Sequence, residues 1–117
     1  MSETSTGATI THAGTVEFED GAYKVGTGTG NWSVSPIPWP GLNPPPPVGQ
    51  VLITFKAPIT GPYSVLVTAR RTFDAPMLAA NYGDANEHSF VVVIFNPVAT
   101  LSYQTVRNAS FSFMVLQ

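Results

Sequence analysis

Side chains able to do acid–base or nucleophilic chemistry are few and scattered in this sequence. The chain has no cysteine, and its two histidines, His12 and His88, lie in different segments. No serine stands in the strained glycine elbow that activates a hydrolase nucleophile. The acidic residues Asp74, Asp84 and Glu87 could approach one another, but carboxylates in neighbouring loops are mostly solvated surface. The inventory therefore predicts that the protein is not an enzyme.

Two short motifs contain residue types found in ligand sites. Residues 84–88, DANEH, lack the glycine and the distal glutamate of a calcium loop, so they indicate a polar turn before a strand. The GTGTGN string at residues 26–31 would need a following helix and a lysine to hold phosphate, and Pro36 interrupts any helix there. We therefore expect neither a metal nor a cofactor.

Aromatic residues beside amides and carboxylates form the more promising candidate site. A sugar site sets ring faces against C–H groups and uses amides or carboxylates to hold hydroxyls. On this basis the candidate ligand- or partner-binding residues are Trp32, Trp39, Asn81, Tyr82, Asp84, Asn86 and His88. The alternative, favoured for both tryptophans, is that they anchor a proline-rich loop to the core or to a neighbouring subunit.

The elements that would position these residues are short β-strands. Residues Thr15–Val25 alternate apolar and polar side chains around Asp20-Gly21, which predicts a hairpin with a type I′ turn. One face of this hairpin would carry Glu17 and Lys24 as a cross-strand charge pair.

Two apolar runs, Val51–Phe55 and Tyr63–Ala69, form the centre of the predicted fold. Seven residues join them, too few for a crossover helix, so the strands should run antiparallel or step from one sheet to another. Ser89–Phe95 is continuously apolar, which predicts burial on both faces. Further strands are expected at Ala8–His12, Met77–Ala80, Leu101–Val106 and Ser110–Leu116, the last with Phe111, Phe113 and Val115 on one face.

A proline-rich stretch interrupts this pattern. Seven of the eleven prolines lie between Pro36 and Pro47, and proline lacks the amide donor that a central strand needs. We therefore expect residues 26–50 to form a long loop over the sandwich. The predicted fold is an all-β, antiparallel β-sandwich of six to eight short strands, with residues 1–14 as an N-terminal arm and 15–117 as a single domain.

Composition narrows the functional classes. Charged residues make up 10% of the chain, against about 25% in typical globular domains, which is common in subunits that bury surface against neighbours. The net charge is −2 and no basic stripe is present, so nucleic acid is not an expected partner. No apolar run approaches the roughly 20 residues of a membrane span. The first residues lack the features of a signal peptide.

From Val51 onward the chain resembles the H-type-lectin-like sandwiches found in invertebrate agglutinins and at the tips of bacteriophage tail fibres. The resembling stretches are ITFKAPITGPYSVLVTA, SFVVVIFN and NASFSFMVLQ. The resemblance implies a six-stranded antiparallel sandwich, assembled as a homotrimer, with sugar sites near protomer boundaries. The chain departs from that family at Phe113, where tryptophan is usual, and at the DANEHS loop, which replaces a tight glycine turn.

These observations predict a non-catalytic virion protein of the phage tail-tip or tail-fibre type. It would work by assembly with itself and with other virion subunits, and by binding cell-surface glycan. One alternative is a capsid decoration protein that clamps neighbouring shell subunits. A second alternative is a free-standing sugar-binding lectin.

Overall fold

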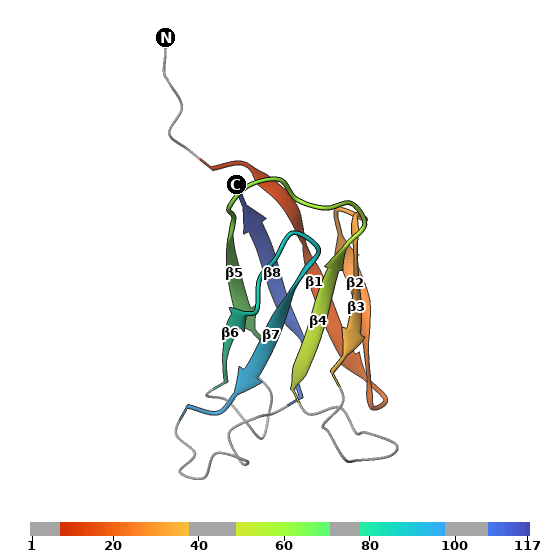
Figure 1. The fold of residues 1–117 in the computed structure, drawn as a ribbon. Helices are drawn as coiled ribbons and strands as arrows, with labels where there is room; N and C mark the ends of the chain where they lie inside the picture. Colours follow the sequence, from red (N-terminus) through yellow and green to blue (C-terminus); the bar gives the residue numbers. More distant parts are fainter. Residues whose placement is uncertain (1–7, 38–48, 71–77, 98–107) are drawn as a thin grey trace.

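The computed structural model describes residues 8–37, 49–70, 78–97 and 108–117, and these form an all-β sandwich (Figure 1). Eight antiparallel strands make up the two layers, which confirms the fold class predicted from the sequence. Sheet A has the order β2-β1-β8-β5 and sheet B the order β3-β4-β7-β6. The strands are β1 (Ile10–Glu19), β2 (Ala22–Gly28), β3 (Trp32–Pro36), β4 (Gln50–Phe55), β5 (Ser64–Ala69), β6 (Ala79–Gly83), β7 (Ser89–Phe95) and β8 (Phe111–Leu116).

The core lies between the two sheets and is built from alternate residues of the central strands. On β8 the predicted inward face is confirmed, because Phe111, Phe113 and Val115 are all buried. On β7 the alternate residues are fully buried while those between them stay partly exposed. The prediction that β7 is buried on both faces is therefore wrong, since only one face of each antiparallel sheet packs on the core.

The hairpin of β1 and β2 has the predicted turn. Asp20 and Gly21 both have positive φ, at 52° and 78°, as a type I′ turn requires. The first strand is longer than expected, because β1 continues the predicted strand at Ala8–His12 straight into the hairpin. Residues Ile10–Gly14, expected in an N-terminal arm, thus pair with β8 inside sheet A.

The predicted charge pair between Glu17 and Lys24 does not form. The two residues face each other in the register, but both carboxylate oxygens of Glu17 accept from the guanidinium of Arg70, at 2.7 and 2.9 Å. Lys24 pairs with Glu19 instead. A bidentate guanidinium offers Glu17 two charge-assisted hydrogen bonds, which a lysine cannot match. This partner also holds the pKa of Glu17 below its usual range.

The stretch expected to be a long loop contains strands at its beginning. The second hairpin strand runs to Gly28, and Trp32–Pro36 forms β3 at the edge of sheet B, paired with β4. Pro36 is the last residue of this edge strand, a position where its missing amide donor is tolerated. The rest of the loop, residues 38–48 with Trp39, lies outside the described residues.

The joint between β4 and β5 carries the chain from sheet B to sheet A, one of the two arrangements predicted (Figure 1). The strand predicted at Met77–Ala80 occurs slightly later, as β6, which includes Asn81 and Tyr82. The strand predicted at Leu101–Val106 lies outside the described residues.

A glycine in β1 makes room for the indole of Trp32. A Cβ placed on Gly14 would overlap Trp32 Cζ2 and the Thr27 carbonyl, whereas nothing lies within 4 Å of a Cβ placed on Gly83 in β6. We expect Gly14→Ala to lower the free energy of unfolding by about 1–3 kcal/mol, the usual cost of overpacking. Gly83→Ala should change it by less than about 0.5 kcal/mol. Urea unfolding of both variants checks this, and equal stabilities would contradict the packing described.

Candidate functional site

Trp32 is part of the core. Its side chain is 3% exposed, its ring meets that of Phe113 edge-on at 4.7 Å, and its indole N–H donates to the Ala13 carbonyl at 3.0 Å. The alternative interpretation, an anchoring tryptophan, is therefore correct, although the residue anchors a strand. Sequence reasoning overlooked this strand because prolines follow it closely.

The five remaining candidate residues lie along β6 and the loop that leads into β7. All five are exposed: Asn81, Tyr82, Asp84, Asn86 and His88. The ring of Tyr82 is 39% exposed and rests edge-on against Phe90. The Nε2 atom of His88 lies 3.1 Å from the Oε1 atom of its neighbour Glu87. Of these five, Asn86 lines a cleft.

Asn86 organises the loop from within. Its side-chain oxygen accepts hydrogen bonds from the backbone amides of His88, at 2.8 Å, and Ser89, at 3.1 Å. The backbone N–H of Asn86 donates to the Ser89 carbonyl at 2.9 Å. This is the local side-chain capping by which asparagine stabilises turns. The side-chain oxygen is thus committed to the loop.

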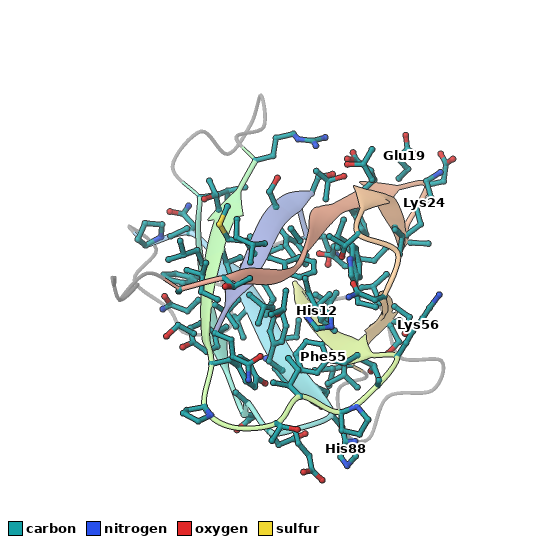
Figure 2. All side chains as sticks on the ribbon, turned by 90° about the horizontal axis from the view of Figure 1, so that it is seen from above. His12, Glu19, Lys24, Phe55, Lys56 and His88 are labelled. Carbon is teal, nitrogen blue, oxygen red and sulfur yellow. The ribbon has the colours of Figure 1, made fainter. Side chains whose placement is uncertain are left out.

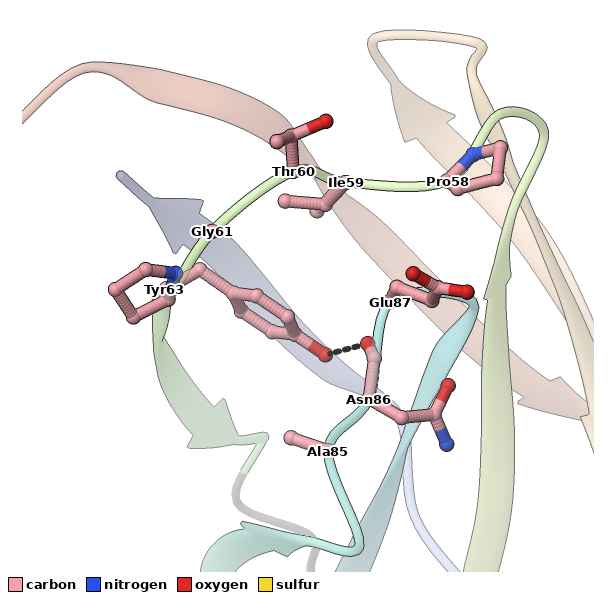
Figure 3. Close-up of a pocket in the computed structure, with 9 residues that line it drawn as sticks. Pro58, Ile59, Thr60, Gly61, Tyr63, Ala85, Asn86 and Glu87 are labelled. Carbon is pink, nitrogen blue, oxygen red and sulfur yellow. Dashed lines mark hydrogen bonds between the residues drawn. The ribbon is translucent and has the colours of Figure 1, made fainter.

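The cleft lies between the β4–β5 joint and residues 85–87 (Figure 3). Its volume is about 440 Å³, and it is lined by Pro58, Ile59, Thr60, Gly61, Pro62, Tyr63, Ala85, Asn86 and Glu87. The Tyr63 hydroxyl donates to the carbonyls of Asn86, at 2.7 Å, and Ser89, at 3.2 Å. At the other side the Ile59 amide donates to the Glu87 carbonyl at 2.8 Å. Both walls are therefore tied together, and the cleft is formed before any ligand arrives.

The cleft combines apolar rings with a few polar groups. Tyr63 packs edge-on against Phe55 at 5.5 Å, which fixes its ring. Burial raises the pKa of the Tyr63 phenol, so this group remains a neutral donor to the loop. The polar side chains are the Thr60 hydroxyl, the Asn86 amide and the Glu87 carboxylate. Such a surface can bind a small, uncharged, polyhydroxylated ring but supplies no nucleophile paired with a base.

The charged side chains of the described residues gather towards the two ends of the sandwich. Near the β1–β2 turn lie Glu17, Glu19, Asp20, Lys24 and Arg70, and towards the opposite end lie Lys56, Asp84 and Glu87. Between these ends the outward-facing residues of the described strands carry no charge in either sheet. The described ranges also contain no cluster of three or more histidine, cysteine or acidic residues that could hold a metal.

Comparison with protein-family models finds no model that matches this chain, and searches of curated proteins and of solved structures find no match either. Among the described residues no helix is long and apolar enough to cross a membrane. Function must therefore be argued from the arrangement of the residues themselves.

His12 lies inside the sandwich, where its ring centroid is 4.6 Å from that of Phe55 (Figure 2). The side chain is 7% exposed, and Nδ1 shares a hydrogen bond with the Thr11 hydroxyl at 2.9 Å. Burial lowers the pKa of His12, because the charged form would lose hydration. Its contacts assign this histidine to the core.

The buried His12 should make the fold sensitive to mild acid. The pKa of His12 is about 6.5 in the unfolded chain and lower in the folded protein. As the pH falls below about 6.5, the unfolded state therefore binds a proton more readily than the folded state does. The contribution of His12 to the free energy of unfolding should be constant above about pH 7. It should decrease as the pH drops through about 6.5 and below. Urea unfolding between pH 7.5 and 5 should show this slope in the wild type and in His88→Ala, and lose much of it in His12→Phe. An unchanged slope in His12→Phe would refute the assignment.

Proposed function

We propose that this chain is a non-catalytic structural and adhesion subunit of a virion, of the phage tail-tip or tail-fibre type. It assembles through the faces of its sheets and binds neutral cell-surface glycan in the cleft beside Tyr63. The observation that carries the proposal is the gathering of charge at the ends of the sandwich, which leaves the middle of each outer face uncharged over the described strands.

The uncharged faces support the assembly part of the proposal. The centre of a protein–protein interface is depleted in charged residues, because each buried charge must be paired or lose its hydration. Ile10 and Leu66 stand on the outer face of sheet A with 52% and 55% of their surface exposed. Apolar side chains in a charge-free setting are the pattern of a surface that meets another protein.

The cleft supports the adhesion part. A fixed tyrosine ring offers an apolar contact to the C–H groups of a pyranose. The Asn86 amide can donate to ring hydroxyls, and the Glu87 carboxylate can accept from them. That carboxylate would repel an acidic sugar, and no cationic side chain lines the cleft to offset it. Neutral hexoses are therefore the ligand class that fits.

Removing the cleft carboxylate tests the adhesion part. On a glycan array we expect the purified wild-type protein to bind neutral glycans in preference to sialylated ones. Glu87→Gln should weaken binding by about tenfold, because a hydrogen bond to a charged group contributes about 1.5–3 kcal/mol.

Asp84→Asn provides a matched control. It removes a carboxylate from the same loop at a residue with φ of 49°, a conformation that asparagine tolerates, and it does not line the cleft. Binding by Asp84→Asn should equal that of the wild type. No binding by the wild type at high micromolar concentration, or equal losses in both variants, would overturn the cleft as the glycan site.

A further inference from the structure

The outer face of sheet A carries two adjacent rows of apolar residues. In the strand register Leu66 lies beside Met114, which lies beside Ala13, and Leu116 in the next row lies beside Ile10. We call these five residues the apolar patch. Because neighbouring residues on one side of a strand are two positions apart, the two rows are contiguous and span β5, β8 and β1. Leu66 and Ile10 are each more than half exposed.

Among the described residues, the row next to the patch is uncharged. The next row holds Thr68, Ser112 and Thr15, and beyond it the Glu17 carboxylate is occupied by the Arg70 guanidinium. A partner that presented charge to this face would lose hydration without gaining an opposite charge. A matching surface must itself be uncharged, and the same patch on a second copy meets this requirement.

The shape of the patch also suits a second copy. A hollow of about 170 Å³ lies beside Leu66, lined by Leu66, Thr68, Ser112, Phe113 and Met114. The exposed Leu66 side chain and the hollow are therefore neighbours on one surface. A two-fold axis close to Leu66 would bring the side chain of each copy to the hollow of the other, which is the self-complementarity that an isologous contact requires.

We propose that the outer face of sheet A is a two-fold interface between two copies of this chain, centred on Leu66 and Met114. This interface is the contact through which the assembly part of the proposed function would operate, and the inference rests on that part. It does not depend on glycan binding. The contact closes on itself, so it produces a dimer and leaves the cleft at the end of each sandwich open to a ligand.

Sedimentation velocity and equilibrium, from low to high micromolar concentrations of the 12.4 kDa chain, test the interface. The wild type should be a reversible dimer. Leu66→Lys and Leu66→Glu should each weaken dimerisation by at least about tenfold, because like charges would meet across the axis. An equimolar mixture of the two variants should recover the dimer, since opposite charges then face each other.

Val25→Lys is the matched control. Val25 is 46% exposed and belongs to the same sheet but lies outside the patch, so this variant should dimerise as the wild type does. Urea unfolding of each variant excludes loss of the fold as the cause. A monomeric wild type, a trimer, or a dimer unaffected by both Leu66 variants would overturn the interface. A monomer that binds glycan would leave the adhesion part standing, whereas a Leu66-dependent dimer without glycan binding would leave only the assembly part.

Discussion

The packing of Phe113 between Trp32 and Phe90 is the contact on which the rest of the fold depends. The Phe113 ring meets both neighbours close to edge-on, at centroid distances of 4.7 and 5.6 Å, and so joins sheet A to both strands that flank β4 in sheet B. Its strand, β8, lies between β1 and β5. Sheet A is therefore complete only when β8 is inserted between β1 and β5, which requires pairing across long stretches of chain. The indole of Trp32 completes the contact by donating to the Ala13 carbonyl of β1.

This arrangement determines what remains for the outside of the molecule. Most of the large aromatic side chains of the described strands pack between the sheets, with Phe95 of β7 as an exception, so the outer faces carry mainly serine, threonine and smaller aliphatic residues. The described charged groups lie towards the ends of the strands, where water is close, and some of them form pairs there, as Arg70 does with Glu17. In the described part of the chain the middle of each broad face is consequently uncharged, and the loops that could recognise a ligand are at the ends. The proposed assembly and the proposed ligand recognition thus use different parts of one small sandwich.

Much of the fold could be predicted from the sequence because alternation is a local signal. It located the hairpin, β4, β5, β7 and β8, together with the inward face of Phe111, Phe113 and Val115. The partner of Glu17 could not be found in this way, because Arg70 is distant in sequence and reaches it only after β5 is placed. The strand at Trp32–Pro36 was missed because the prolines after it dominated the interpretation. The glycines in the preceding GTGTGN string were a usable signal, since Gly28 lies against the indole of Trp32.

The candidate site was harder to predict, for a related reason. Of the candidate residues that the structure describes, only Asn86 lines the cleft, and the opposite wall comes from the Pro58–Tyr63 joint, which sequence reasoning treated as scaffold. At each end of the sandwich a tyrosine hydroxyl donates a hydrogen bond that links two distant segments of the chain. At the hairpin end Tyr23 donates to the Asn108 side chain in a buried setting that raises its pKa to about 12, so that phenol is fully committed to structure. At the opposite end Tyr63 makes the equivalent tie from a partly exposed position. A ring that is both fixed and accessible suits a ligand contact, which supports the proposal of a glycan site at the Tyr63 end, whereas the Tyr23 phenol only ties the structure together.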